Sequence, residues 1–403
     1  MKILFVSQYF YPESFRGNDI AFELAKAGHD VHVVCGTPNY PIGKFFDGYG
    51  WLKRRKEVVN GVRVTRLPII PRGHNAVMLM LNYFSYLICA SLYMLVHALF
   101  HRYDKVFVQQ LSPVMMSYPA IIYKRLRKVE LVTWVLDLWP ESLRAAGGIT
   151  NKHVLGFFAY FVRQEYKWSD KILISSRNFE KSIAEYGDYH EKIVYFPQWA
   201  EDTIAQSGEE TLDVPTLPDG FKIMFAGAVG EAQDFDHVME AALQTKDDEN
   251  IKWVIVGDGR KFEWVKEFVK SHGLERTVLL MGRYPVEYMS GFFKQADVML
   301  VCLKDTEIFR LTAPAKIQAY MAVGKPILAM LNGEGAAVVE EARCGYIVPA
   351  ENAERLAQTV KELASKREDE LQEVGRRGLA YYQDHFEKQK CMEHLFEILS
   401  VER

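Results

Sequence analysis

The chain has 403 residues and a mass of 46.4 kDa, and at roughly 150 residues per domain this length predicts two or three domains. Apolar residues make up 49% of the chain and charged residues 25%, which excludes disordered, collagen-like and disulfide-framework proteins. The net charge of −3 is unevenly divided, with +9 on residues 1–200 and −12 on the remaining residues. The basic half predicts an anionic partner: a membrane surface, a phosphate-bearing ligand or nucleic acid.

Short apolar runs rich in β-branched residues alternate with helical stretches over the first 200 residues. We predict strands at 2–7, 31–35, 62–70, 105–109, 131–136, 171–175 and 193–196. Between the first two of them, 18–26 has helical spacing, and Gly28 stands where a glycine ends such a helix. This alternation predicts a mostly parallel sheet with helices on both faces.

One segment of the first half, 76–100, contains no charged residue. As a single helix it would be about 37 Å long, which is enough to cross a bilayer. A single crossing would separate the strands before it from those after it, although they must share one sheet. The segment is therefore either a buried helix or a helix lying in the membrane interface. The basic clusters 53–56 and 124–128 favour the interface, although each alone is also typical of a solvated face.

A polar linker at 201–220, rich in proline, glycine and glutamate, predicts a domain boundary. The strand pattern then restarts at Lys222, and we predict strands at 222–226, 253–256, 278–281, 298–302, 326–330 and 346–348. Charged helices are expected over 354–401. The predicted fold class is α/β, with two doubly wound Rossmann-like domains at 1–200 and 201–380 facing across a ligand cleft. A C-terminal helix at 381–403 is expected to pack back on the first domain.

Glycines end three successive predicted strands of the second half. They occur in the groups Gly227 with Gly230, Gly257-Asp258-Gly259, and Gly282-Arg283. Glycine at a strand-to-helix turn lets a ligand approach the backbone, and a helix N-terminus attracts anions. The groups together predict a nucleotide site in this half, although each alone could be a plain tight turn. Their spacing is not the dinucleotide fingerprint G-x-G-x-x-G.

Two cations flank another predicted helix start. Thr312 is the expected N-cap residue, with Pro314 in the first turn. Arg310 and Lys316 would bracket this N-terminus, and two cations with free N–H groups make a diphosphate pocket. The alternative is an exposed helix start with ordinary surface charges.

In the basic half, Asp137 opens the sequence Asp-Leu-Trp-Pro-Glu-Ser at the end of the strand at 131–136. A carboxylate at a strand end is a candidate general base or charge stabiliser, and the alternative is a helix N-cap. Arg16-Gly17-Asn18 and the Pro-Asn-Tyr-Pro sequence around Asn39 are expected on the same rim. No metal site is predicted, because the histidines are dispersed and no His-Glu-x-x-His sequence occurs.

Cysteine usage and the N-terminus bear on the compartment. The five cysteines are scattered, with no Cys-x-x-Cys pair, which is typical of reduced thiols in the cytosol. Met1-Lys2 leads directly into the apolar run 3–6, so we expect no signal peptide. These features predict a cytoplasmic protein.

The assembled motifs resemble glycosyltransferase family 4, which has the GT-B fold, over nearly the whole chain. The sharper similarity is to its WbuB-like branch, which makes O-antigen and capsule and includes N-acetyl-L-fucosamine transferase. That branch shares the Pro-Asn-Tyr-Pro sequence, the Asp-Leu-Trp-Pro-Glu-Ser sequence, a G-x-x-G-x-x-Q turn at 227–233 and an F-R-x-T-x-P-x-K sequence at 309–316.

The resemblance implies a retaining transfer of a sugar, such as the N-acetylated hexosamine N-acetyl-L-fucosamine, from a UDP-sugar to a saccharide on polyprenyl diphosphate. No metal or other cofactor is implied, and the enzyme would lie on anionic lipid at the inner face of the cell membrane. The implied catalytic residues are Asp137 and Glu141. The implied donor-binding residues are Gly227, Gly230, Gln233, Gly257, Asp258, Arg283, Arg310, Lys316, Gln318 and Glu334. The implied acceptor-binding residues are Arg16, Gly17, Asn18, Asn39 and Trp139.

The chain departs from the family in its second half. The usual Arg and Lys of the glycine loop fall on Ala228 and Asp234, and the usual pair of Glu falls on Leu311 and Ala319. Two other readings therefore remain open, a nucleotide-sugar epimerase of the same fold and a binding protein with a degenerate site. A nucleic-acid partner is not expected, since the basic residues form no motif for one.

Overall fold

The computed structural model describes residues 1–73, 75–147, 150–205 and 212–400. Proximity of Cα atoms divides the chain into two compact units. The first unit is Met1–Pro197 with the residues from Met392 onward, and the second is Gln198–Cys391. The last helix, α16 (Lys388–Leu399), runs across this division. Its C-terminal part is tied to the first unit, where the Lys171 ammonium donates to the Ile398 carbonyl.

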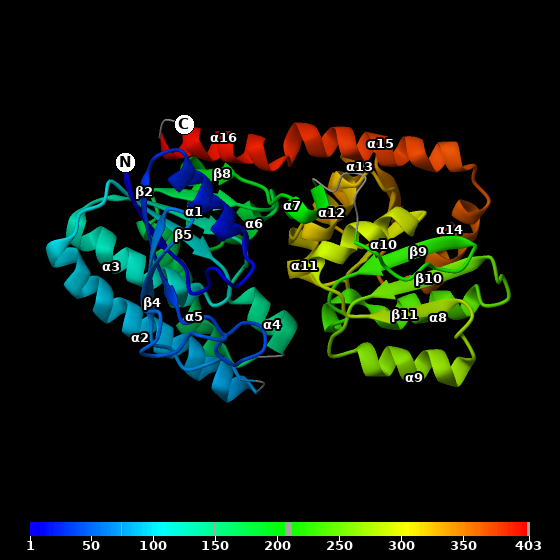
Figure 1. The fold of residues 1–403 in the computed structure, drawn as a ribbon, viewed down its shortest axis with the longest axis horizontal. Coiled ribbons are helices and arrows are strands. Elements are labelled where there is room, and N and C mark those ends of the chain that lie inside the picture. Colours follow the sequence, from blue (N-terminus) through cyan, green and yellow to red (C-terminus); the bar gives the residue numbers. More distant parts are fainter. Residues whose placement is uncertain (74, 148–149, 206–211, 401–403) are drawn as a thin grey trace. The chain divides into compact units, whose positions relative to one another are not determined.

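The first unit is built on a sheet that includes β2, β4, β5 and β8 (Figure 1). The sheet has eight strands in the order β3-β4-β2-β1-β5-β6-β7-β8. The strands are β1 (Lys2–Val6), β2 (Asp30–Gly36), β3 (Lys56–Val59), β4 (Val62–Leu67), β5 (Lys105–Gln110), β6 (Glu130–Val135), β7 (Lys171–Ile174) and β8 (Ile193–Tyr195). All neighbours are parallel except β3 and β4. The strand order reverses between β1 and β5, where ligands bind in open α/β sheets.

Strand β3 is absent from the sequence prediction and covers the end of the basic cluster 53–56. It forms an antiparallel hairpin with β4 through Asn60 and Gly61, whose φ angles are 48° and 82°. Two successive residues with positive φ are the requirement of a type I′ turn, for which Asn-Gly is the preferred pair. The Asn-Gly pair was therefore the available signal for this strand.

Helices cover both faces of the first sheet. They are α1 (Arg16–Lys26), α2 (Ala76–Phe100), α3 (Tyr118–Arg127), α4 (Glu141–Gly147), α5 (Lys152–Trp168) and α6 (Phe179–Ala184). Leu4 and Val6 of β1 pack with residues of α2 and α3, whereas Phe5 points to the opposite face, towards Gly17 of α1. Gly28 ends α1 with φ of 87°, donating to the Ala25 carbonyl, as its sequence position predicts.

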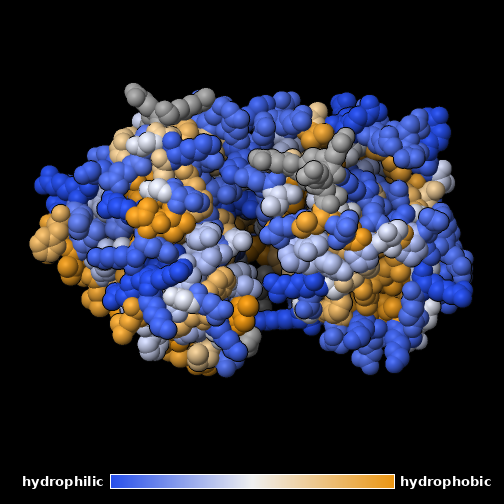
Figure 2. All heavy atoms as spheres, viewed as in Figure 1, coloured by the Kyte–Doolittle hydropathy of each residue, from blue (hydrophilic) through white to orange (hydrophobic). Residues whose placement is uncertain are grey.

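The segment 76–100 is a single helix, α2, with one face packed on the sheet and the other exposed. Tyr86, Ala90 and Met94 are buried in the core, and Ile88 and Leu92 are 56% and 60% exposed. Helix α2 is long and apolar enough to cross a membrane. In its most apolar stretch of 18 residues, only 28% of the residues are buried. Figure 2 shows hydrophobic residues gathered along the outer side of this unit, over α2. One face of this segment therefore packs in the core, and contact of the exposed apolar face with a membrane interface stays a prediction.

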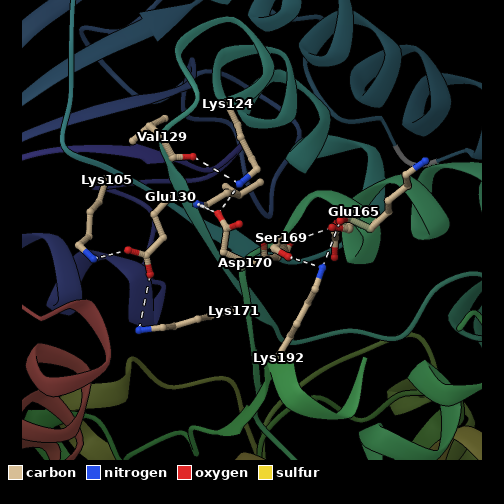
Figure 3. Close-up of polar contacts among 12 residues, drawn as sticks. Lys105, Lys124, Val129, Glu130, Glu165, Ser169, Asp170, Lys171 and Lys192 are labelled. Atoms are coloured by element: carbon tan, nitrogen blue, oxygen red, sulfur yellow. Dashed lines mark hydrogen bonds and ion pairs between the residues drawn. The ribbon is translucent and has the colours of Figure 1, made fainter. Parts of the chain in front are cut away.

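Ion pairs fasten the amino-terminal edge of the first sheet (Figure 3). Glu130, at the start of β6, pairs with Lys105 and Lys171 on the neighbouring strands, and Asp170 pairs with Lys124. Lys192 donates to the carbonyls of 166, 167 and 169 at the end of α5, where a helix leaves carbonyls without partners. These contacts lie at the edge of the sheet opposite to the strand ends that carry Asp137.

Glu165 on α5 is a buried carboxylate that gives the first unit a pH-dependent stability. Burial raises its pKa to about 8, and the nearby Ser117 hydroxyl offsets this only in part. The folded state therefore holds a proton that the unfolded state loses near pH 4.3, so stability falls as pH rises from about 5 to 8. We expect a slope of about 1.4 kcal/mol per pH unit from this one group. Thermal unfolding of Glu165→Gln should show a weaker fall over this range than the wild type, and equal pH profiles would contradict the prediction.

The second unit is built on a six-stranded parallel sheet in the order β11-β10-β9-β12-β13-β14. Its strands are β9 (Phe221–Ala226), β10 (Ile251–Val256), β11 (Val278–Gly282), β12 (Val298–Cys302), β13 (Ile327–Met330) and β14 (Gly345–Val348). Its helices are α7 (Asp202–Ala205), α8 (Phe235–Gln244), α9 (Phe262–His272), α10 (Met289–Gln295), α11 (Glu307–Leu311), α12 (Ala315–Ala322), α13 (Glu334–Glu341), α14 (Ala353–Ala364) and α15 (Glu368–His385). Alternate strand residues pack against helices on opposite faces, such as Met224 with α12 and Phe225 with α8. The doubly wound architecture predicted for both halves is confirmed.

Candidate functional site

The strand order of the second unit reverses between β9 and β12, and the predicted glycines lie at this point. Gly227 follows β9 and Gly257 follows β10, with φ angles of 134° and 150° that favour glycine. A Cβ added at Gly257 would lie 1.8 Å from the Gly227 carbonyl oxygen. A side chain at Gly257 would overlap the Gly227 backbone, and the positive φ of Gly227 disfavours a side chain there. The two turns therefore form a bare backbone surface at the carboxyl ends of the strands.

Lys316, near the start of α12, reaches this surface. A Cβ added at Gly227 would lie 2.3 Å from the Lys316 Nζ, and the same Nζ lies 4.7 Å from the ring centroid of Phe225. Burial lowers the pKa of Lys316, and no carboxylate within the described ranges pairs with its ammonium. A partly buried ammonium beside bare backbone at a strand-order reversal is a site prepared for an anion.

Other predicted donor residues lie on the helices around Lys316. Gln318 follows on α12, and its Oε1 is buried without a hydrogen-bond partner among the described residues. Glu334 is buried at the start of α13. Its neighbour Gly335 packs against α12, because a Cβ added at Gly335 would lie 3.3 Å from the Ile317 side chain. Gln233 holds the turn after β9, since its Oε1 accepts from the Gly230 N–H at 3.1 Å.

The predicted start of the helix that carries Lys316 is wrong. Thr312 lies at the end of the short helix α11, where its hydroxyl donates to the Ile308 carbonyl, and Pro314 is the N-cap residue of α12. Arg310 belongs to α11, so it does not bracket the same N-terminus as Lys316. Its guanidinium pairs with Asp305 at 2.5 and 2.7 Å on the surface. This ion pair could not be predicted from the sequence, because Asp305 lies in the loop after β12.

Two further residues that were predicted to bind the sugar donor, Asp258 and Arg283, lie at exposed positions on the rim of the sheet. Asp258 accepts from the N–H of Gly259 at 2.7 Å, so its carboxylate shapes its own turn. Arg283 follows β11, which is the edge strand, two strands away from β9. At about 4.8 Å per strand this places the Arg283 backbone roughly 10 Å from the Gly227 turn.

In the first unit, Asp137 lies two residues beyond β6 and is half-buried. Its carboxylate accepts from the Trp139 indole N–H at 3.1 Å and from the Ser142 hydroxyl. Burial raises its pKa, and these hydrogen bonds with one from Ser112 offset part of the rise. Asp137 therefore does not act as the N-cap of α4, which begins at Glu141. Trp139 is itself buried, edge-on to Tyr83 and Phe158, so it orients the carboxylate.

Glu141 is a second perturbed carboxylate close in sequence to Asp137. Tyr186 donates to its Oε1 at 3.1 Å, while its Oε2 is buried without a hydrogen-bond partner among the described residues. Burial is the main cause that raises its pKa. Two carboxyl groups with raised pKa at the end of one strand are the arrangement typical of acid–base chemistry.

The predicted acceptor residues of the first unit mostly shape the rim. Asn18 accepts from the Tyr11 N–H and donates to the Glu13 carbonyl, and Asn39 accepts from the Arg72 N–H at 2.7 Å. A Cβ at Gly17 would lie 2.0 Å from Gln109 Oε1, so a larger residue there would displace the Gln109 side chain. Arg16 is the first residue of α1. Direct acceptor contacts from these residues stay a prediction.

Glu13 is a functional candidate that the sequence analysis missed. Its buried carboxylate accepts from the backbone N–H groups of Phe10, Asn39 and Tyr40, at 3.3, 2.8 and 2.7 Å. It thereby joins the loop after β1 to the loop after β2, and burial raises its pKa to about 7. The signal available in the sequence was a glutamate in an otherwise aromatic loop.

No group of three or more His, Cys, Asp or Glu that could hold a metal ion occurs among the described residues. The two carboxylates of the Asp-Phe-Asp sequence at 234–236 serve other contacts. Asp234 accepts from His237 at 2.8 Å, and Asp236 pairs with Lys261.

Comparison with known families matches both units. Residues 17–199 match the glycosyl transferase 4-like domain, and residues 220–366 match glycosyl transferases group 1. Taken with the two doubly wound units, these matches identify the chain as a glycosyltransferase with the GT-B fold.

A relative and two solved structures agree with this class. The chain is 25% identical to WcaI of Escherichia coli K12, a glycosyl transferase provisionally assigned to colanic acid biosynthesis, over 80% of this chain and 82% of that one. It shares the fold of HepE from Anabaena, solved with UDP and glucose, at a TM-score of 0.69 and 14% identity over 99% of each chain. It also shares the fold of a sucrose-phosphate synthase from Thermosynechococcus elongatus, at a TM-score of 0.71 and 15% identity over 99% and 98%.

Proposed function

We propose that the protein is a retaining, metal-independent glycosyltransferase of O-antigen or capsule biosynthesis, which transfers a sugar from a UDP-sugar to a saccharide on polyprenyl diphosphate. The donated sugar would be an N-acetylated hexosamine such as N-acetyl-L-fucosamine. The observation that carries the proposal is the Lys316 ammonium beside the bare turns of Gly227 and Gly257. A diphosphate there would meet the positive charge of Lys316, which would stabilise the diphosphate as it leaves the sugar. The N–H groups of Gly227 and Gly257 already donate to the Val256 and Gly282 carbonyls, so the turns contribute close access to the backbone and no free donors.

The relatives support this choice of substrate and pathway. HepE binds UDP, and WcaI is provisionally assigned to colanic acid biosynthesis. In the first unit, the candidate base or charge stabiliser is Asp137. Asp137 would stabilise positive charge developing on the sugar or take the proton of the acceptor hydroxyl.

The first experiment is a thermal-shift screen of the purified protein against UDP, GDP, dTDP, CMP and ADP. A nucleotide present at 100 times its dissociation constant stabilises the folded protein by about 2.7 kcal/mol, so a selective shift is measurable. A shift with UDP alone supports the proposed donor. A shift with none of the five contradicts a functional donor site and favours a degenerate binding protein.

We further propose that the enzyme lies on the inner face of the cell membrane through α2. The exposed face of α2 continues into an apolar groove of about 330 Å³ shared with α3 and α5, lined by Leu87, Ile88, Leu92, Tyr118, Ile122 and Phe161. Apolar surface of this kind favours insertion into the interface, where it would meet a lipid-linked acceptor. An epimerase acting on soluble nucleotide sugars would not need it.

The α2 face gives a direct prediction. Ile88→Glu with Leu92→Glu should weaken binding to lipid vesicles by roughly 100-fold, since each buried side chain contributes about 1.5 kcal/mol or more. Vesicle co-sedimentation measures this effect. Ile347→Glu, at an exposed apolar position of the second unit, is the matched control and should bind like the wild type. Equal binding of all three proteins would contradict membrane contact through α2.

A further inference from the structure

A second cavity of the first unit lies where α2 ends, at the amino-terminal edge of the sheet. It has a volume of about 440 Å³, and its walls come from the start of β1, the start of β2, the segment 99–103 and the last residue of α3. This edge is opposite to the strand ends that carry Asp137 and Glu13. The cavity is therefore separate from the candidate active site.

The walls of this cavity are strongly basic. Lys2, Arg63, Arg102 and Arg127 line it together with His101, while Asp30 is the one carboxylate in the lining. Asp30 forms an ion pair with Arg63, with 2.7 Å between its Oδ1 and the Arg63 Nη2. Outside the lining, Asp104 accepts a hydrogen bond from the backbone N–H of Lys2. Even with both carboxylates counted, the cations outnumber them, so the cavity attracts anions.

Arg127 adds a donor that lacks an acceptor. Its Nε is buried and makes no hydrogen bond to any part of the chain that the structure describes. A buried guanidinium N–H without a partner costs free energy, and a small shift of the Arg127 side chain towards an oxyanion in the cavity would recover it. Guanidinium groups also match the geometry of phosphate oxygens.

Two histidines behind the cavity carry no charge at neutral pH, mainly because they are buried. The Tyr103 hydroxyl joins His32 and His97, lying 2.9 Å from His97 Nε2. Burial is the main cause that lowers the pKa of His32 to about 3 and of His97 to about 4, and the nearby Arg63 and His101 lower both further. Both histidines are therefore neutral at pH 7, and the positive charge of this region resides on the lysine and arginines.

The cavity also has an apolar rim. Leu99 and Phe100 line it, and they are 69% and 77% exposed at the end of the apolar face of α2. A soluble phosphate would use the cations alone, whereas a phospholipid would use both features. Its phosphate would meet the cations while its acyl chains continue along the apolar face.

We propose that this cavity binds the phosphate headgroup of an anionic phospholipid and anchors the end of α2 to the membrane. The proposal rests on the membrane contact through α2 and adds to it a specific headgroup site. The first unit would then be held at two places along one helix, the apolar face at 88–92 and the phosphate site at 99–102.

The test compares two double variants. The cavity variant carries Arg102→Gln and Arg127→Gln. The control variant carries Lys246→Gln and Lys270→Gln, which remove two exposed cations elsewhere. Co-sedimentation uses vesicles of phosphatidylcholine alone and vesicles with 30% phosphatidylglycerol. We expect the cavity variant to bind phosphatidylglycerol vesicles at least tenfold more weakly than the control variant. Binding to phosphatidylcholine, which depends on the apolar face, should stay equal in the two. Arg102→Lys with Arg127→Lys, which keeps the charge, should retain most of the binding.

Three results would overturn the proposal. Equal binding of the cavity and control variants to phosphatidylglycerol vesicles would show that the site contributes only diffuse charge. A thermal shift with inorganic phosphate or glycerol 3-phosphate that the cavity variant loses, with vesicle binding unchanged, would assign the site to a soluble phosphate. Wild-type protein that binds neither kind of vesicle would remove the membrane contact itself. The thermal shift with UDP is independent of all three, so it tests the donor site separately.

Discussion

Lys316→Met is expected to lower the affinity for UDP by about 1.5–3 kcal/mol, the range of a lost hydrogen bond to a charged group, which is roughly 10–150-fold in the dissociation constant. The physical reason is that the Lys316 ammonium is the cation that reaches the Gly227 turn, and Met fills a similar volume without charge. Isothermal titration with UDP measures the change. Lys270→Met, on the exposed side of α9, is the control and should bind UDP like the wild type.

The same substitution should not destabilise the protein without ligand. Burial lowers the pKa of Lys316, which means that the fold disfavours its charged form. Removing the charge should therefore leave the melting temperature unchanged or raise it, while the shift produced by UDP shrinks. A bound diphosphate favours the charged ammonium, so wild-type affinity should fall as pH rises through this lowered pKa. Unchanged UDP affinity in Lys316→Met at neutral pH would refute a phosphate role for this lysine.

Local signals in the sequence predicted the parts of the fold that depend on neighbours along the chain. Gly28 marked the end of α1 because only a few residues adopt positive φ at that position. Asn60-Gly61 carried an equally local signal for the β3–β4 hairpin. The preceding cluster 53–56 was interpreted as a membrane-facing or solvated charge cluster, and the strand that begins at Lys56 was missed. The alternation of strands and helices was sufficient for the doubly wound architecture of both units.

Contacts between loops that are distant along the chain could not be predicted from the sequence. Parallel topology placed Gly227 and Lys316 at the same edge of a sheet, but the approach of Nζ to the glycine depends on where α12 begins. That start was misjudged because the loop after β12 supplies Asp305, which holds Arg310 in a separate short helix. Glu13 was missed for the same reason, since its partners are backbone N–H groups of another loop.

Asp137→Asn is expected to lower turnover by about 10²–10⁴-fold, the contribution of a general base, while the dissociation constant for UDP changes little. Asn keeps the shape of the side chain and can still accept from Trp139, so the loop should hold its conformation. Its amide cannot take a proton, and it cannot balance positive charge on a sugar. Initial rates of sugar transfer, with UDP binding measured in parallel, separate the two effects.

The environment of Asp137 adds a pH signature to this prediction. Burial raises its pKa above the usual value for aspartate, and the base works only when ionised. Wild-type turnover should therefore fall on the acid side at a higher pH than an exposed aspartate would cause, and the variant should lose this limb. Ser142→Ala removes one hydrogen bond to the ionised carboxylate, so it should raise the pKa and move the acid limb to higher pH without abolishing turnover. Asp188→Asn, at an exposed position of the first unit, is the control. If Asp137→Asn turned over like this control, Asp137 would serve only to fix the loop between β6 and α4.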